Sequence, residues 1–179
     1  MAMTAATSTA GRCTARLLLR PLQAGDLAPL FKIQQDPVAM RHTYVATSPD
    51  AAAQRLRAWE AERLRRGFAP WVVADRGTRA VLGWGGLGVD PFDPAWGPEV
   101  SYFLAPSAWG RGLATELVAS TLSLAFDELA LPAVSAFAMA DNHASVRVLE
   151  KCGFEFLCDE PALERRHYRL TRAKARAAA

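Results

Sequence analysis

Apolar and polar residues recur along the chain with two different spacings, and each spacing predicts one kind of secondary structure. Apolar side chains three and four residues apart, which form one face of a helix, follow Asp26, Ser48, Gly112 and Asn142. Short apolar or alternating runs predict strands. These runs cover residues 15–20, 71–74, 80–87, 99–104, 134–139, 154–158 and 166–170. The predicted order is therefore β-α-α-β-β-β-α-β-α-β-β.

Residues that favour helix ends set the predicted helix boundaries. Asp26 can cap a first helix that ends near residues 36–37, and Gly153 closes a short fourth helix. The third helix is expected over residues 112–130, because Pro132 cannot continue it.

The second helix has the clearest boundaries. Ser48 followed by Pro49 is a strong helix start, and Gly67 is a typical stop. We expect this helix to bury Leu56, Trp59 and Leu64 and to expose its arginines.

Only the strands at 99–104 and 134–139 are joined by a helical crossover, which parallel strands require. The order therefore predicts an α/β (α+β) fold, a mixed and mostly antiparallel twisted sheet with helices on both faces. We expect one domain at residues 15–171, preceded by a disordered lead or tag remnant at 1–14 and followed by a basic, Ala-rich tail at 172–179.

Composition narrows the class of protein. Apolar residues make up 51% and charged residues 22%, which is typical of a soluble globular protein. The net charge of +3 is spread over mixed Lys, Arg and Glu, so it indicates no nucleic-acid surface but suits an anionic ligand. We find no apolar run of membrane-spanning length and no signal peptide.

The three cysteines, Cys13, Cys152 and Cys158, form no Cys-x-x-Cys pair. We therefore expect a reduced, cytoplasmic protein without a metal site.

A glycine-bearing turn, Trp109-Gly110-Arg111-Gly112, joins the 99–104 strand to the third helix. The first turn of a helix has N–H groups without intrahelical partners, and the helix dipole places positive charge there. The turn is thus either an anion site, to which Arg111 adds a cation, or only a tight turn, and spacing alone leaves both open.

Two better-known phosphate loops are excluded. No P-loop string occurs, and the Gly83-x-Gly85-x-x-Gly88 match is followed by Asp90-Pro91, which does not open a helix. We interpret this second stretch as a glycine-rich strand.

Four stretches carry a resemblance to a known family: residues 17–26 (LLLRPL and Asp26), 36–40 (DPVAM), 99–116 (EVSYFLAP, then GRGLATE) and 142–154 (NHAS, then EKCGF). Together they resemble the GCN5-related N-acetyltransferase (GNAT) superfamily, and more closely its RimJ/RimL branch, which acetylates protein N-termini and some small amines. The resemblance covers residues 15–171. It implies a GNAT fold with a splay between the fourth and fifth main strands, and acetyl-CoA as co-substrate.

The resemblance also implies a donor site. The pyrophosphate would bind the N–H groups of Gly110, Arg111, Gly112, Leu113 and Ala114, and the pantetheine arm would pair like a strand with Phe103 and Leu104. Trp109 opens the loop, and Thr115 and Asn142 complete this predicted site. Asn142 has a second interpretation as a helix N-cap.

Acetyl transfer to an amine needs a base, and Glu99 is the best candidate. An unperturbed Glu, with a pKa of about 4.3, would be a weak base unless burial raised its pKa. The alternative is a surface carboxylate at a strand end.

The leaving thiolate needs stabilisation or a proton. Many GNAT members place a Tyr where this chain has Leu149, so Ser145 is the implied substitute, as an acid or only to position the sulfur. Tyr102 and Tyr168 are interpreted as sheet side chains.

The acceptor site is expected in two variable segments. Arg41, His42 and Tyr44 lie in one of them, and Phe92 and Trp96 lie in the other. The predicted acceptor is a protein or peptide N-terminal α-amine. An antibiotic or polyamine acetylase is the alternative enzyme, and a non-catalytic acyl-CoA-binding module is the alternative from another class. Homodimers are common in the family, although no interface is visible in the sequence.

Overall fold

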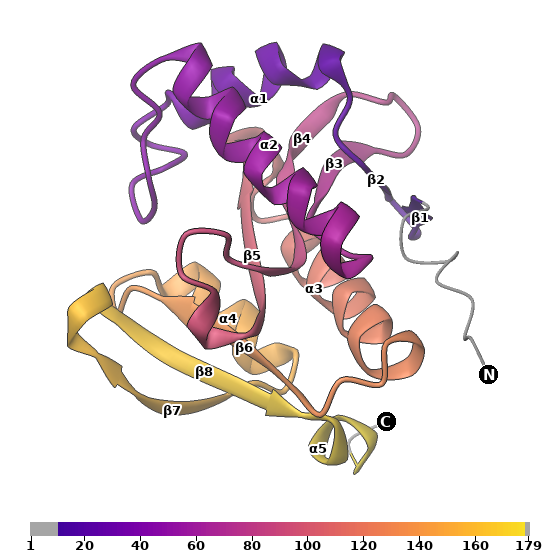
Figure 1. Ribbon diagram of the computed structural model, residues 1–179, viewed down its shortest axis with the longest axis vertical. Helices are drawn as coiled ribbons and strands as arrows, with labels where there is room; N and C mark the ends of the chain where they lie inside the picture. The colour runs from indigo at the N-terminus through magenta and orange to yellow at the C-terminus, as the bar shows by residue number, and fades with distance from the viewer. Residues whose placement is uncertain (1–10, 178–179) are drawn as a thin grey trace.

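The computed structural model describes residues 11–177, in which helices cover both faces of a mixed sheet (Figure 1). The strands are β1 (Arg12–Cys13), β2 (Leu17–Arg20), β3 (Trp71–Asp75), β4 (Val81–Val89), β5 (Pro98–Leu104), β6 (Ala133–Ala138), β7 (Glu155–Glu160) and β8 (Arg165–Thr171). The helices are α1 (Leu27–Gln34), α2 (Pro49–Arg66), α3 (Leu113–Ser123), α4 (His143–Lys151) and α5 (Arg172–Ala177).

Within the described residues the sheet has the strand order β1-β2-β3-β4-β5-β6-β8-β7. Neighbouring strands are antiparallel except for β5 and β6, which are joined through α3. In the described chain β5 and β6 pair only at Glu99–Ser135 and Val100–Ala136, so the rest of β5 diverges from β6. The predicted fold class and its splay are confirmed.

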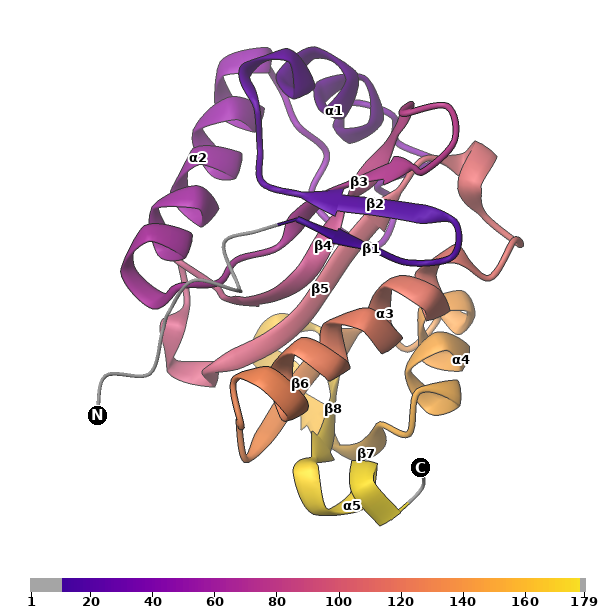
Figure 2. The same ribbon diagram turned by 90° about the vertical axis from the view of Figure 1, so that its right-hand side faces the viewer.

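Two apolar clusters hold the helices on opposite faces of the sheet, as Figure 2 shows for α2 and α3. The alternation of side chains along β3 explains this division. Val72 faces α1 and α2, where it packs with Leu30, Trp59 and Trp84. Its neighbour Val73 faces the larger cluster, which contains α3 and α4.

The second helix keeps its predicted boundaries. The Ser48 side chain accepts a hydrogen bond from the Ala51 N–H, and Gly67 ends the helix with a φ of 82°. Leu56 and Trp59 are buried and Arg57, Arg65 and Arg66 are exposed, as predicted, while Arg55 is half-buried. The prediction was wrong for two residues: Arg63 is buried, whereas Leu64 is 88% exposed. Positions 52, 56, 59 and 63 share one helical face, which is buried. The burial of Arg63 on this face is stabilised by a hydrogen bond of 2.6 Å from its guanidinium to the Pro70 carbonyl oxygen.

The glycine-rich stretch interpreted as a strand lies entirely within β4. At Gly88, a Cβ would lie 2.3 Å from the Trp59 ring, so the small residue allows α2 to pack closely on the sheet.

The chain ends differ from the expected boundaries. Residues 1–10 of the predicted disordered lead lie outside the described residues, but Arg12–Cys13 forms β1 and pairs with β2. Within the predicted tail, Arg172–Ala177 forms α5, while residues 178–179 also lie outside the described part. The predicted third helix is α3 continued by a π-helical turn over Leu124–Glu128.

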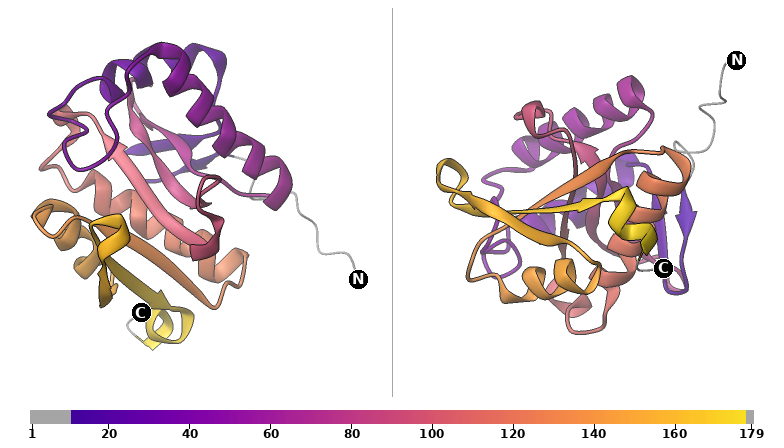
Figure 3. Two further views of the ribbon diagram at one scale, coloured as in Figure 1. Left: turned by 60° about the vertical axis from the view of Figure 1, so that its left-hand side comes forward. Right: turned by 90° about the horizontal axis from the view of Figure 1, so that it is seen from below.

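The last two strands form a hairpin at the end of the sheet (Figure 3). Their register shifts between Phe156 and Cys158, so that Cys158 rather than Leu157 lies opposite His167. This β-bulge changes which side chains share a face.

Candidate functional site

The turn between β5 and α3 has the backbone geometry that its glycines suggest. Gly110 and Gly112 have φ angles of 71° and 74°, in the left-handed region that favours glycine. Gly112 is the N-cap of α3, and no side-chain hydrogen bond caps this end of the helix. The first-turn N–H groups and the helix dipole therefore form a suitable anion site.

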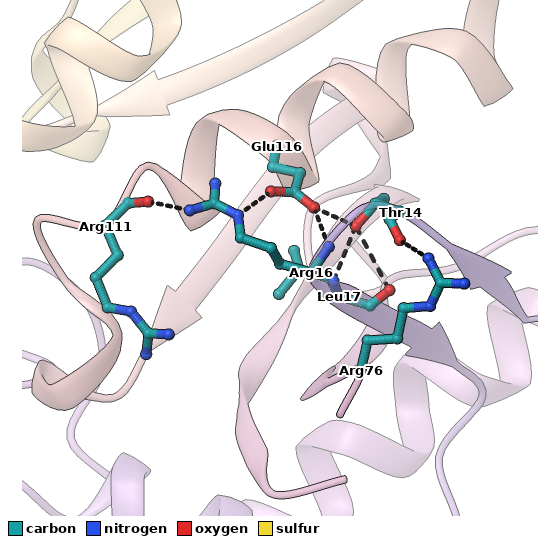
Figure 4. A network of polar contacts seen from close by, with 6 residues as sticks. All are labelled: Thr14, Arg16, Leu17, Arg76, Arg111 and Glu116. Carbon is teal, nitrogen blue, oxygen red and sulfur yellow. Dashed lines mark hydrogen bonds and ion pairs between the residues drawn. The ribbon is translucent and has the colours of Figure 1, made fainter. Parts of the chain in front are cut away.

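A polar network attaches the first turn of α3 to the start of β2 (Figure 4). The Arg16 Nε donates to Glu116 Oε2 at 2.7 Å, and its Nη1 donates to the Arg111 carbonyl oxygen at 2.7 Å. Thr14 Oγ1 also donates to Glu116. Figure 4 shows the Arg111 guanidinium directed away from Glu116. The network thus fixes the loop backbone through the Arg111 carbonyl and leaves the Arg111 side chain outside it as a cation.

This network shifts the ionisation of Glu116. Burial acts to raise the pKa of Glu116, but hydrogen bonds from Thr14 and Arg16 outweigh it, so the pKa lies below its usual value. Glu116 is therefore ionised at neutral pH, in the form that holds Arg16 beside the loop.

A cavity of about 340 Å³ opens beside the loop, and we call it the glycine-loop cavity. It lies between the end of β5, the loop, the start of α4 and residues 39–43. Ten residues from the predicted donor and acid positions line it: Phe103, Leu104, Trp109, Gly110, Gly112, Leu113, Ala114, Thr115, Asn142 and Ser145. The structure therefore brings these parts of the chain to one place.

Trp109 fixes one wall of this cavity. Its indole Nε1 donates to the Leu104 carbonyl oxygen at 2.8 Å, and the Arg41 guanidinium lies 5.5 Å from the centre of its ring. Trp109 therefore ties the loop to the end of β5 and places a cation nearby.

Two hydroxyl groups meet in the cavity. The Tyr102 hydroxyl donates to Ser145 Oγ at 3.2 Å, while Asn142 Oδ1 accepts from the Ser145 N–H at 3.2 Å as the N-cap of α4. Burial raises the pKa of Tyr102 to about 12, against a lowering effect of Ser145. Tyr102 therefore stays protonated near neutral pH. It is a side chain of β5, as interpreted, and it also donates a hydrogen bond in the cavity, which the sequence did not indicate.

A second cavity of about 150 Å³, which we call the Glu99 cavity, lies on the α1–α2 side of β5. Both cavities are lined by Thr43, Tyr102 and Phe103, so they meet at the splayed part of β5. A group in one cavity can therefore approach a group in the other.

Glu99 is only 9% exposed. Burial raises its pKa to about 8, with Asp90 and Asp93 acting in the same direction and Arg165 opposing them. A carboxylate with this pKa can take up a proton near neutral pH, which the unperturbed group does poorly. The alternative of a surface carboxylate does not hold, because the structure buries Glu99.

Two residues that line the Glu99 cavity each carry a buried polar atom without a partner. Gln34 Oε1 and Ser101 Oγ are buried, and neither finds a hydrogen-bond partner among the described residues. Unpaired buried polar atoms are costly, so their presence beside Glu99 indicates that the cavity accepts hydrogen-bond donors from outside the chain.

The predicted acceptor residues are divided between the two cavities. Tyr44 lines the Glu99 cavity, whereas Arg41 and His42 line the glycine-loop cavity. Trp96 is not among the described residues that line either cavity; its ring packs against Phe137 and His167. Arg111 also lines neither, although its carbonyl oxygen belongs to the network of Figure 4.

Arg55 on α2 is another residue that the sequence did not single out. Its guanidinium lies 5.1 Å from the centre of the Tyr44 ring and 4.5 Å from that of Phe92. It lines the Glu99 cavity beside two exposed aromatic rings. No sequence signal identifies it, because helix α2 carries several arginines.

Known proteins share this architecture. Residues 16–155 match the family model of the acetyltransferase (GNAT) domain. The uncharacterized protein YkkB of Bacillus subtilis is 30% identical over 146 residues, which cover 80% of this chain and 84% of YkkB. Within the described part of the chain, no helix has the length and apolar character for crossing a membrane.

Solved structures share the fold. An acetyltransferase from Agrobacterium tumefaciens has a TM-score of 0.77 and 23% identity, covering 89% of this chain and 93% of its own. A spermidine N-acetyltransferase from Vibrio cholerae was solved in complex with CoA and spermine. It has a TM-score of 0.70 and 20% identity, and the match covers 90% of this chain and 99% of that enzyme's chain.

Proposed function

Because this chain belongs to the GNAT family of acetyltransferases, we propose that it moves an acetyl group from acetyl-CoA to a primary amine, with both substrates bound at once. The two cavities that meet at Thr43, Tyr102 and Phe103 support direct transfer between them. We propose the glycine-loop cavity for the donor and the Glu99 cavity for the acceptor.

The donor site combines the loop and the free part of β5. The N–H groups of residues 110–114 would hold the pyrophosphate, with Arg111 as a nearby cation. Phe103 and Leu104 belong to the part of β5 that diverges from β6, which suits pairing with the amide groups of the pantetheine arm. Asn142 and Thr115 line the same cavity and would complete the contact.

The three acceptor groups on residues that line the Glu99 cavity are the observation that carries the proposed acceptor. Glu99 offers a carboxylate, and Gln34 and Ser101 offer buried oxygens without partners. An ammonium group has three N–H donors and no acceptor. These oxygens therefore fit a primary amine that binds charged and then transfers a proton to Glu99.

Acetyl-CoA supplies the activated acyl group. Glu99 accepts the proton of the acceptor ammonium, which frees the nitrogen lone pair for attack. A backbone N–H near Leu104 would stabilise the charge that develops on the acetyl oxygen. Ser145 Oγ would donate a hydrogen bond to the departing sulfur, and the Tyr102 hydroxyl would orient Ser145 by donating to its Oγ. The remaining proton of the attacking nitrogen leaves as the amide forms and neutralises the thiolate. A thiol has a reference pKa of about 8.5, so Ser145 needs to contribute little.

Arg55 favours a peptide as the acceptor. Its guanidinium lies against the exposed rings of Tyr44 and Phe92, where it can donate to the carbonyl oxygens of a peptide that continues out of the cavity. A polyamine has no acceptor groups for the guanidinium, and Asp90 is the side chain of the same cavity with which its second ammonium would pair. We therefore propose a protein or peptide N-terminal α-amine, the activity of the RimJ/RimL branch. A compact small-molecule amine is the second candidate, because the cavity measures only about 150 Å³.

The decisive experiment measures thiol release from acetyl-CoA with N-terminal peptides, aminoglycosides and polyamines as acceptors. We expect release with peptides, and Arg55→Ala should raise the peptide KM at least tenfold while donor affinity stays unchanged by calorimetry. Release with polyamines alone would overturn the peptide proposal. Donor binding without release across a broad panel would favour the acyl-CoA-binding module.

A further inference from the structure

The β-bulge in the C-terminal hairpin gathers three side chains that can bind a metal. Without the register shift at Leu157, that leucine would lie opposite His167. The shift instead places Cys158 opposite His167, and Glu160, two residues further along β7, projects from the same face. A thiol, a carboxylate and an imidazole therefore converge on one face of the hairpin.

The distances between these groups resemble those of a tetrahedral site. Cys158 Sγ lies 3.2 Å from Glu160 Oε1, and His167 Nδ1 lies 3.9 Å from the same oxygen. All three ligand atoms lie within 4.8 Å of one another. Zinc bonds of about 2.0–2.3 Å at tetrahedral angles separate neighbouring ligand atoms by about 3.3–3.6 Å. The side chains thus need only small rotations to share one ion.

The second ring nitrogen of His167, which would not bind the metal, already has a hydrogen-bond partner. His167 Nε2 lies 3.0 Å from the Ser135 hydroxyl oxygen, and the buried ring stacks on Phe137 at a centroid distance of 4.6 Å. Trp96 packs edge-on against the same ring. A hydrogen bond to the distal nitrogen orients a metal-ligating histidine, and Ser135 supplies that partner here.

We propose that Cys158, Glu160 and His167 form a binding site for Zn²⁺, with water in the fourth coordination position. Thiolate and imidazole ligands suit zinc and disfavour magnesium or calcium, which prefer oxygen ligands. Binding replaces the thiol proton of Cys158, which is released to solvent. In the part of the chain that the structure describes, this is the one group of three such side chains close enough to hold an ion.

The site does not follow from the spacing of the cysteines, which led us to expect no metal. It depends on the shift in the pairing register of β7 and β8 between Phe156 and Cys158. It is also independent of the proposed acetyl transfer, because none of its three ligands lines the glycine-loop cavity or the Glu99 cavity.

Cobalt provides a spectroscopic test. The full-length protein is stripped with a chelator and titrated with Co²⁺. We expect one equivalent to produce the charge-transfer absorption of a thiolate–cobalt bond, and one equivalent of Zn²⁺ to abolish it. Cys158→Ser should remove the band, and Ser135→Ala should weaken Zn²⁺ binding about 10–100-fold. Cys152→Ser is the matched control, since Cys152 lies near the Thr115 carbonyl, and it should keep the band.

Thermal melts of the stripped variants verify that each one folds. Absence of the band from the folded wild-type protein would overturn the proposal, as would its persistence in Cys158→Ser. The Cys158–Glu160 contact would then be a thiol–carboxylate hydrogen bond only. Glu160→Gln and His167→Gln should each weaken Zn²⁺ binding at least tenfold, and unchanged affinity in both would equally reject the three-ligand site.

Discussion

Single side chains in this protein take their chemistry from where the fold places them. Glu99 and Tyr102 lie three residues apart on β5, and burial raises the pKa of both, to about 8 and about 12. Near neutral pH, Glu99 therefore exists in both its protonated and its ionised form, whereas the Tyr102 hydroxyl stays protonated. The same strand thus carries a group suited to accepting a proton and a neutral hydroxyl suited to donating a hydrogen bond.

Glu99→Gln tests the proposed base. In the wild-type protein, the fraction of ionised Glu99 increases as pH rises through about 8, so turnover should increase over the same range. The variant has no carboxylate, and we expect turnover to drop about 100-fold with little change in acetyl-CoA affinity. A pH–rate profile measured for both proteins checks this. A profile unaltered by the change would exclude Glu99 as the base.

Stability measurements on the same pair provide an independent check of the pKa. The pKa of Glu99 is raised from 4.5 in the unfolded chain to about 8, so the native state binds the extra proton between these values. Wild-type stability from this group is therefore lost as pH rises from about 4.5 to 8, whereas glutamine shows no such loss. Denaturant unfolding should show Glu99→Gln gaining stability relative to wild type over that window.

Tyr102→Phe tests the hydrogen bond from the Tyr102 hydroxyl to Ser145. If Tyr102 acts through Ser145, both Tyr102→Phe and Ser145→Ala should lower kcat, each by about 10-fold or more, with a small effect on the acetyl-CoA KM. The double variant should then be no slower than the slower single variant, because both changes break the same hydrogen-bonded pair. Independent, multiplicative losses in steady-state kinetics would show that the two hydroxyls do not act in series.

At the scale of elements, the loop and helix α3 form the proposed donor site as one unit. The positive φ angles at Gly110 and Gly112 and the network of Arg16 with Glu116 fix the direction of the first-turn N–H groups. The proposed anion site is therefore a property of the backbone, and the side chains around it mainly hold that backbone in place.

Gly112→Asp should abolish acetyl-CoA binding, because it introduces a carboxylate where the proposal places phosphate. A side chain at a φ of 74° also costs about 1–2 kcal/mol in backbone strain. Gly112→Ala is the matched control, since it carries the strain without the charge and should bind more tightly than the aspartate variant. Calorimetry measures both, and wild-type affinity in Gly112→Asp would end the donor-site proposal.

Elements with local signals were predictable from the sequence. Helix α2 could be bounded because Ser48 and Gly67 act through their own backbone neighbours. β1 and α5 were missed because two and six residues are too few to establish a period. Leu64 was placed on the wrong face because the partner that buries Arg63, the Pro70 carbonyl, lies outside the helix.

The sites show the same distinction. The glycine loop is contiguous in sequence, so its form and the residues around it were predictable. The Glu99 cavity draws Gln34, Arg55 and Ser101 from three separate elements, and Tyr102 meets Ser145 across 43 positions. Such contacts depend on how the helices and strands pack together, which a local sequence pattern does not predict.

On the scale of the whole molecule, the sheet separates the two cavities and brings them together at one place. The cluster that includes Trp59 and Trp84 packs α1 and α2 against one face and also forms the wall of the Glu99 cavity. The larger cluster holds α3 and α4 on the other face, next to the glycine-loop cavity. The divergence of β5 from β6 opens the sheet where the two cavities share residues.

This division predicts that a change in the α1–α2 cluster alters acceptor kinetics alone. Leu56 is 2% exposed and lines the Glu99 cavity, so Leu56→Ala should cost about 2–5 kcal/mol of stability and enlarge that cavity. We expect the acceptor KM to change several-fold while acetyl-CoA affinity is retained. Val118→Ala on α3, which is buried in the other cluster, is the matched control with a comparable packing defect. Denaturant unfolding and two-substrate kinetics measure both variants, and equal loss of donor affinity in Leu56→Ala would show that the two cavities are not separate sites.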